Sequence, residues 1–148
     1  MIPPESLVLL DTNVVVHLAR GNATGRALDE RYQLRSRRER PLICVVTVGE
    51  LLTLARGWRW SQEKIDALKG LCRDMVVVDI AREPILARYA DLMDHGRSSG
   101  RPLGENDAWI AAAASVTGAH LLTLDQGLRF IPSDLAKVEC VDQEGLSR

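Results

Sequence analysis

Short, uniformly apolar runs alternate with longer amphipathic or charged stretches along the chain. Five of these runs have the length and composition of strands: 7–10, 42–46, 75–78, 120–123 and 138–141. Because they lack the polar alternation of a half-exposed sheet, we expect the strands to be covered on both faces. The pattern therefore predicts an α/β fold with a parallel sheet between helices.

The stretches between these runs predict helices, which we place at 23–38, 47–55, 61–73, 84–95 and 104–117. Ser61 is a good N-cap for the third of them. The last contains four consecutive alanines, Ala111 to Ala114, which are small enough to let a helix lie close to a sheet. The segment 96–104 has three glycines and Pro102, and it predicts a loop.

The segment Val14 to Val16 has two interpretations. Three β-branched residues favour the second arm of a hairpin. Asp11 is a good N-cap, however, and two parallel strands need a crossover between them, which favours a helix. We expect the helix.

The composition is that of a globular protein with a substantial core. The chain has 148 residues, of which 46% are hydrophobic and 26% are charged, with a net charge of −1. This length predicts one domain over residues 1–148. The apolar segment 7–18 is interrupted by Asp11 and too short to span a bilayer. We therefore expect a cytoplasmic protein with its native N-terminus and no membrane association.

Three cysteines, Cys44, Cys72 and Cys140, lie far apart in the sequence. They form no Cys-x-x-Cys pair, and no histidine lies at ligand spacing from them or from another histidine. We expect three buried thiols and no zinc site.

Four acidic residues, Asp11, Glu50, Asp107 and Asp125, fall near the ends of predicted strands. Asp11 follows the first strand, Glu50 lies in the first turn of the next helix, and Asp107 lies in the first turn of the alanine-rich helix. Asp125 comes two residues after the fourth strand. Sites in open α/β sheets form beyond the carboxyl ends of the strands. Four carboxylates at one such edge would repel each other unless a cation lay between them, and such oxygen ligands suit Mg²⁺ or Mn²⁺.

Each acid also has a purely structural interpretation. Asp11 would cap a helix, and Glu50 with Thr47 fits a Thr-x-x-Glu capping box. Asp107 would interact with the helix dipole, and Asp125 would form an Asx turn with the residues that follow it. These interpretations leave unexplained why all four acids gather at the same edge of the sheet.

Four segments resemble the motifs of PIN-domain ribonucleases. They are Leu9-Leu10-Asp11-Thr12-Asn13-Val14, Thr47-Val48-Gly49-Glu50-Leu51, residues 100–112 around Asn106-Asp107, and Leu121-Leu122-Thr123-Leu124-Asp125 running on to Phe130. Their order and spacing agree over nearly the whole chain, and its short length resembles the VapC-type toxins of type II toxin–antitoxin systems. The resemblance implies a three-layer α/β/α fold with a mostly parallel five-stranded sheet.

The resemblance also implies a site. Asp11, Glu50 and Asp107 would be catalytic residues that form the core of a metal site, with Asp125 as the fourth acid. The supporting polar residues would be Thr12, Asn13 and Asn106.

The last motif departs from the family pattern. Many relatives place a further acid shortly before its aromatic residue, whereas here Gly127, Leu128 and Arg129 lead to Phe130. Asp125 would then carry the fourth role alone. Glu105 is a partial substitute, although we expect it to face solvent.

We therefore expect an endoribonuclease that depends on Mg²⁺ or Mn²⁺ and acts as the toxin of a toxin–antitoxin pair. The metal would orient and deprotonate a water for in-line attack on a phosphodiester of structured RNA. The resemblance implies a homodimer and a cognate antitoxin whose tail lies across the site.

Other functions are compatible with the same fold class. A phosphatase needs a second Asp at position 13, which is Asn13, and a receiver domain needs an acidic pair where Leu9 and Leu10 stand. A PIN-like nuclease of RNA maturation and a catalytically silent PIN-like binding module remain open.

Two surface features also have more than one interpretation. A basic cluster contains Arg31, Arg35, Arg37, Arg38 and Arg40. It is either a solvated helix face or a contact for RNA phosphates or an acidic partner. Trp58 and Trp60 either mark an interface with RNA, antitoxin or a second copy, or pack in the core.

Overall fold

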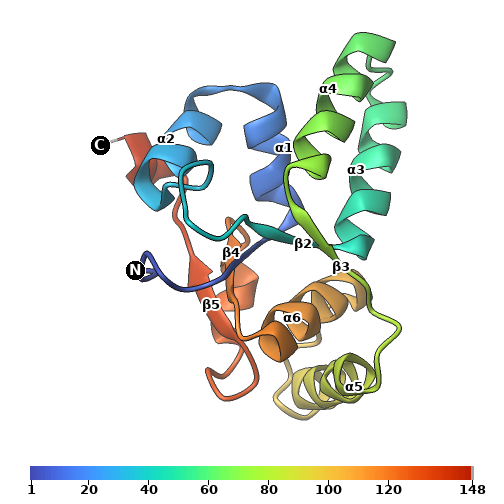
Figure 1. The fold of residues 1–148 in the computed structure, drawn as a ribbon. Coiled ribbons are helices and arrows are strands. Elements are labelled where there is room, and N and C mark those ends of the chain that lie inside the picture. The colour runs from blue at the N-terminus through green and yellow to red at the C-terminus, as the bar shows by residue number, and fades with distance from the viewer. Residues whose placement is uncertain (148) are drawn as a thin grey trace.

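A computed structural model of the chain describes residues 1–147. Five short strands form one sheet: β1 Val8–Leu10, β2 Leu42–Cys44, β3 Val76–Val78, β4 His120–Thr123 and β5 Lys137–Cys140. The strand order is β3-β2-β1-β4-β5, and every neighbouring pair is parallel. All the strands therefore end at the same edge of the sheet (Figure 1).

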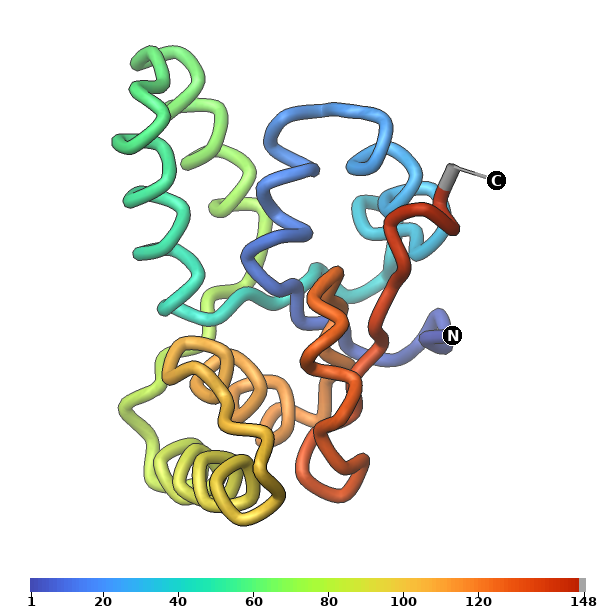
Figure 2. The backbone as a smooth tube through the Cα atoms, turned by 180° about the vertical axis from the view of Figure 1, so that it is seen from behind, coloured from blue at the N-terminus to red at the C-terminus, as the bar shows by residue number. Residues whose placement is uncertain are grey.

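Helices connect the strands. They are α1 Thr12–Arg20, α2 Ala23–Tyr32, α3 Val45–Gly57, α4 Gln62–Arg73, α5 Glu83–Ser98 and α6 Glu105–Thr117, with the 3₁₀ helices η1 Gln126–Phe130 and η2 Glu144–Ser147. Helices α1 to α4 lie on one side of the sheet, and α5 and α6 lie on the other (Figures 1 and 2). The predicted three-layer α/β/α fold with a five-stranded sheet is confirmed.

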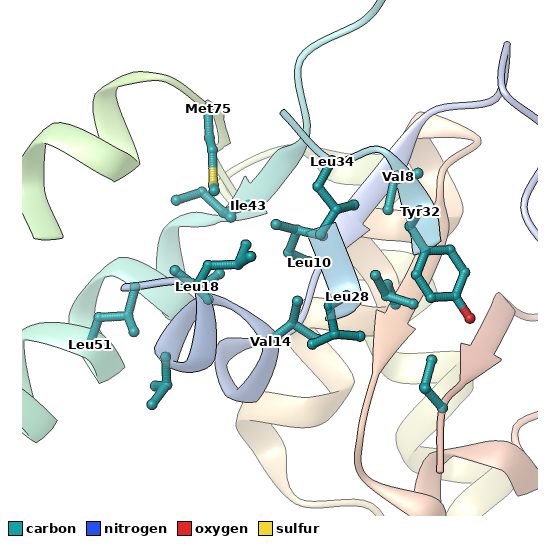
Figure 3. Packing of buried hydrophobic residues seen from close by; sticks show 14 of the residues in the cluster. Val8, Leu10, Val14, Leu18, Leu28, Tyr32, Leu34, Ile43, Leu51 and Met75 are labelled. Carbon is teal, nitrogen blue, oxygen red and sulfur yellow. The ribbon is translucent and has the colours of Figure 1, made fainter. Parts of the chain in front are cut away.

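Each face of the sheet has its own hydrophobic cluster because successive side chains of a strand point to opposite faces. Leu10 packs with Val14, Leu28 and Ile43 toward α1 and α2 (Figure 3). Leu9 belongs to the opposite cluster, which contains the buried alanines of α6. The small alanine side chains bring α6 close to the sheet, as the sequence pattern predicted.

The topological switch point of the sheet lies beside β1. The chain passes from β1 to β2 on one side, whereas β4 pairs with β1 on the other. The carboxyl ends of β1 and β4 therefore meet where the direction of the connections reverses, and ligands of open α/β sheets bind at such points. Asp11 follows β1, and Thr123 ends β4.

The ambiguous segment Val14 to Val16 is helical, as we expected, and its side chains are buried. The strand prediction for Val45 and Val46 is wrong, because α3 begins at Val45 directly after β2. The predicted helix over 23–38 also ends early, at Tyr32. Gln33 adopts the left-handed conformation with φ 54°, which terminates α2.

The cysteines are less buried than we expected. Cys44 is buried, but Cys72 and Cys140 are only half-buried, so the expectation of three buried thiols is wrong for two of them. Within residues 1–147, we find no helix with the length and hydropathy required to cross a bilayer.

Candidate active site

Asp11 lies at the end of β1 and caps α1. Its backbone N–H continues the sheet by donating to the carbonyl of Leu122. Both carboxylate oxygens accept hydrogen bonds: Oδ1 from the N–H of Thr12 at 2.7 Å and Oδ2 from the hydroxyl of Thr123 at 2.6 Å. With 4% of its surface exposed, Asp11 is buried and held in one orientation.

Thr123 is a site residue that the sequence analysis did not single out. Besides donating to Asp11, its hydroxyl accepts the N–H of Asp125 at 3.0 Å. Asn13 strengthens the same junction, since its Oδ1 accepts the N–H of Leu124 at 3.1 Å. The sequence signal was available, because Thr123 is the last strand residue and stands two positions before an acid.

The side chain of Glu50, which belongs to α3, is held by a residue of α1. The hydroxyl of Thr12 donates to Glu50 Oε1 at 2.7 Å, and the same hydroxyl is hydrogen bonded to Thr47 at 3.1 Å. Thr12 therefore supports the site as a polar residue that links α1 to α3.

The capping-box interpretation of Glu50 is wrong. Helix α3 begins at Val45, so Thr47 lies inside its first turn and Glu50 lies in the second turn, not in the first. The N-cap is Cys44, which makes no side-chain cap. Thr47 and Glu50 instead direct their side chains to Thr12.

Asp107 lies in the first turn of α6, as predicted. Burial raises the pKa of its carboxyl to about 6, and the negative charges of Asp11, Asp125 and Glu50 add to this effect. The structure thus brings all four acids of the sequence analysis within electrostatic reach of one another.

Burial also raises the pKa of Asp11, and the charges of Glu50 and Asp125 act in the same direction. The hydrogen bonds from Thr123 and Thr12 oppose this by stabilising the ionised form. The Asp11 carboxylate therefore lies among other negative charges, while hydrogen bonds from Thr12 and Thr123 stabilise its ionised form.

Asp125 combines the two roles that the sequence left open. Its Oδ1 accepts the N–H of Gly127 at 2.9 Å, which is the expected Asx turn, and it caps η1. Its charge also raises the pKa of both Asp11 and Asp107. The structural role and membership of the acidic cluster coexist.

Two other candidates lie outside this network. Asn106 and Glu105 are exposed at the start of α6, and neither side chain makes a hydrogen bond to the described residues. His17 sits in the last turn of α1, where its Nδ1 lies 2.9 Å from Nδ2 of Asn22. His17 therefore does not lie beside Asp11 as a candidate general base.

The donor set fits a hydrated divalent cation better than an enclosed metal cage. Across the described part of the chain, no three Asp, Glu, His or Cys side chains already converge closely enough to hold a metal ion. Mg²⁺ commonly binds through one or two carboxylates and keeps several waters, so it does not require such a cage. Clustered carboxylates with raised pKa values suit this kind of ion.

Comparison with known protein families identifies the family to which this fold belongs. The profile described as "PIN domain" matches residues 8–132, from the start of β1 to just beyond η1. The chain belongs to the PIN domain family. The match includes all four acids, and the family predicted from the sequence motifs is confirmed.

The chain is also similar in sequence and structure to individual proteins. Ribonuclease VapC1 of Haemophilus influenzae strain R2866 is 29% identical over 117 residues, which cover 79% of this chain and 85% of that protein. A solved structure of VapBC-1 from nontypeable Haemophilus influenzae has a TM-score of 0.71 at 26% identity, covering 90% of this chain and 97% of that one.

VapBC2 from Rickettsia felis, solved bound to a DNA fragment from its promoter, has a TM-score of 0.77 at 20% identity. That likeness covers 92% of this chain and 99% of the Rickettsia chain. At this level of identity, it concerns the fold.

The basic cluster lies away from the acids. Most of it occupies the segment between α2 and β2, at the edge where the strands begin. Arg37 donates to the carbonyls of Tyr32, Pro3 and Ser6, and thus fastens the N-terminal segment. The position of the cluster separates it from the carboxylates by the length of the sheet.

The two tryptophans lie at the junction of α3 and α4, with ring centroids 5.7 Å apart. Trp60 packs against the core, whereas Trp58 is 43% exposed and lies under the guanidinium of Arg20 at 4.3 Å. The core-packing interpretation therefore holds for Trp60, and an interface at Trp58 stays a prediction.

Proposed function

We propose that this PIN domain is a metal-dependent endoribonuclease that cleaves structured RNA. The observation that carries the proposal is the gathering of four carboxylates at the switch point, where burial, together with the charges of the other three acids, raises the pKa of Asp107 to about 6. Carboxylates held together against their mutual repulsion are expected where a cation binds. The similarity to a protein named Ribonuclease VapC1 supports the same activity.

Asp11, Glu50, Asp107 and Asp125 would hold Mg²⁺ or Mn²⁺. When bound, such an ion supplies a more acidic water and neutralises charge that develops on the phosphate. The chain's own side chains prepare this site. Thr123 and the N–H of Thr12 hold the Asp11 carboxylate, and the Thr12 hydroxyl orients Glu50.

Asp107 has a different part in this scheme. Because the pKa of the Asp107 carboxyl lies at about 6, most molecules of the metal-free protein carry a proton on Asp107 below that pH. A protonated carboxyl is a poor ligand, so cation binding should weaken as the pH falls through this range.

The proposed biological role is that of the toxin in a toxin–antitoxin pair, acting in the cytoplasm as a homodimer with a cognate antitoxin. The similar solved structures include VapBC assemblies and a member described as belonging to the VapBC family of toxin–antitoxin systems. Exposed apolar side chains such as Trp58 and Val77 are available for a partner to cover.

Cleavage assays on purified protein test the activity. We expect RNA to be cut with Mg²⁺ or Mn²⁺ and to stay intact in EDTA, and we expect Asp11→Asn and Asp107→Asn to abolish cleavage while circular dichroism remains unchanged. Full turnover in either variant would remove the proposed site. RNA binding without cleavage in any metal would favour the silent binding module.

Expression in cells tests the biological role. We expect growth arrest that a co-expressed antitoxin relieves. Harmless expression of a protein that cleaves RNA in vitro would favour a nuclease of RNA maturation.

A further inference from the structure

An exposed aromatic ring is flanked by two arginines, and all three residues come from segments that adjoin Asp107 or Asp125 in the sequence. Phe130 is 44% exposed, which is unusual for so large an apolar side chain. The guanidinium carbon of Arg101 lies 3.6 Å from the centroid of its ring, and that of Arg129 lies 4.9 Å from it. We call these three residues the Arg–Phe cluster.

The Arg–Phe cluster is joined in sequence to two of the four acids. Arg101 lies in the loop that leads into α6, six positions before Asp107. Arg129 and Phe130 lie in η1, which begins directly after Asp125. Both segments therefore run from the cluster into the carboxylate edge of the sheet.

The two arginines have free hydrogen-bonding capacity. Within residues 1–147, none of the four ion pairs involves Arg101 or Arg129, and neither guanidinium makes a hydrogen bond. A guanidinium against an aromatic ring keeps the N–H groups along its rim available. The cluster thus offers planar surfaces together with donors for an anion.

The backbone beneath Arg101 is fixed. Its N–H donates to the carbonyl of Gly96 at 2.9 Å. A Cβ at Gly96 would lie 3.0 Å from the carbonyl oxygen of Arg101, so the loop packs on α5 at a distance that only glycine allows without a shift. This packing holds the Arg101 backbone beside η1, with which it lines a small shared pocket.

The net charge of the chain is −1, so the protein as a whole does not attract RNA, and the position of its individual cations matters. A phosphate chain approaching four carboxylates meets repulsion unless cations nearby offset it. The basic segment between α2 and β2 is at the opposite edge of the sheet and cannot serve this purpose at the site. The Cys140 thiol contacts the carbonyl of Asp125. Burial and the charge of Asp125 raise the pKa of this thiol, and the charge of Arg129 lowers it, so Arg129 lies within electrostatic reach of the surroundings of Asp125. Arg101 lies against the same Phe130 ring as Arg129.

We propose that the Arg–Phe cluster binds an unpaired nucleotide of the RNA strand next to the phosphodiester that is cleaved. The guanidinium planes and the ring would stack with the base, and the guanidinium N–H groups would donate to the adjacent phosphate. The inference rests on the proposed nuclease function and extends it to how the site holds its substrate. Because planar stacking surfaces are exposed together with cations, they fit a nucleotide better than an acidic peptide, which offers no base.

The experiment measures binding without cleavage. A fluorescein-labelled single-stranded RNA pool of mixed sequence is titrated with protein in EDTA, and its anisotropy is followed at several salt concentrations. We expect Arg101→Ala and Arg129→Ala each to weaken binding about five- to tenfold and to reduce the salt slope by about 0.7, the value of one phosphate contact on a single strand. Arg38→Ala is the matched control, because Arg38 is exposed at the opposite edge of the sheet. It should change binding less than twofold.

Two more variants separate stacking from charge. Phe130→Leu keeps an apolar side chain but loses the ring, so we expect about fivefold weaker binding with an unchanged salt slope. Arg101→Lys keeps the charge and loses the plane, so it should retain the slope but not the full affinity. Should Phe130→Leu fail to fold in circular dichroism, the exposed Arg101 variants still decide the outcome.

The results separate failure of this inference from failure of the proposed function. Wild-type binding by both arginine variants, or a loss no greater than that of Arg38→Ala, would overturn the Arg–Phe cluster even if the protein cleaves RNA with metal. Loss of binding to a labelled peptide of aspartate and glutamate, with RNA binding unchanged, would overturn it in favour of a protein partner. Absence of cleavage in any metal would overturn the nuclease and with it the assignment of this cluster to a substrate.

Discussion

The two halves of the acidic cluster are held in different ways. Asp11 and Glu50 accept hydrogen bonds from the hydroxyls of Thr123 and Thr12, which reach them from other elements. In the described structure, Asp107 accepts no such bond, and Asp125 is bound only through the turn that it caps. We call these the hydroxyl-held half and the free half.

This difference has an energetic consequence. In the hydroxyl-held half, hydrogen bonds oppose the effect of burial on the pKa of Asp11. In the free half, nothing opposes it, and the pKa of Asp107 is raised to about 6. We infer that the hydroxyl-held half fixes the geometry of the site, whereas the free half contributes charge that is relieved only when a cation binds.

The largest effect in the hydroxyl-held half is expected for Glu50→Gln. Glutamine can still accept the hydrogen bond from the Thr12 hydroxyl, but it carries no charge. Loss of a residue that only orients a metal ligand typically lowers activity roughly 10–100-fold, and we expect the rate of cleavage to fall by more than this. Initial rates in Mn²⁺ measure the loss. Near-normal rates would show that the hydrogen bond, and not the charge, is what the site needs.

A smaller effect is expected for Thr12→Val, which removes the hydroxyl that orients Glu50. Cleavage should fall roughly 10–100-fold, as for other residues that orient a ligand. Thr12→Ser should recover most of the activity because serine restores the donor. Equal loss in both variants would indicate a packing effect at this buried position rather than orientation of Glu50.

Asp107→Asn tests the free half through stability. The folded pKa of Asp107 is raised above its ordinary value of 3.8, so the ionised group destabilises the metal-free fold. This penalty begins above pH 4 and is complete above about pH 6. Asp107→Asn should therefore stabilise the protein in EDTA at pH 7.5 by about 1–2 kcal/mol, since partial exposure reduces the roughly 1.4 kcal/mol per pKa unit. At pH 4 the gain should vanish.

Thermal and urea melts at the two pH values measure this change. Asp11→Asn serves as the comparison. Its amide replaces one of the two carboxylate oxygens that accept hydrogen bonds from Thr12, Thr123 and Asn13, so this variant should gain less stability. A destabilised Asp107→Asn at pH 7.5 would mean that Asp107 acts as an ordinary first-turn acid.

The smallest effect on cleavage is expected for Asp125→Asn. Asparagine preserves the Asx turn to Gly127, so only the charge is lost, and the rate should fall about tenfold or less. Asp125→Ala also removes the turn and should cost about 1 kcal/mol of stability in a urea melt. A complete loss of activity in Asp125→Asn would move Asp125 into the core of the site.

The sequence predicted the sheet and the gathering of acids because both depend on local patterns. Apolar runs marked the strands, and parallel strands must end at one edge. The boundary of α3 could not be read in this way. Val45 and Val46 favour a strand locally, yet they lie in a helix that carries Thr47 and Glu50 to Thr12, a contact that is remote in sequence.

Two other features depended on the folded chain. The helix former Gln33 gives no signal that α2 ends there, since its left-handed conformation is a property of the folded backbone. The role of Thr123 arises because β4 lies next to β1, so that its hydroxyl reaches Asp11 across 112 positions of sequence. Strand order is not written in any single segment.

Metal-dependent stabilisation tests the acidic cluster as a cation site most directly. Wild type, Asp11→Asn and Asp107→Asn are melted in EDTA and across a Mn²⁺ titration. We expect wild type to gain about 2.7 kcal/mol at a hundredfold excess over its dissociation constant, and we expect both variants to lose most of that gain. A wild-type protein whose melting ignores Mn²⁺, or variants that respond as strongly as wild type, would contradict the cation site.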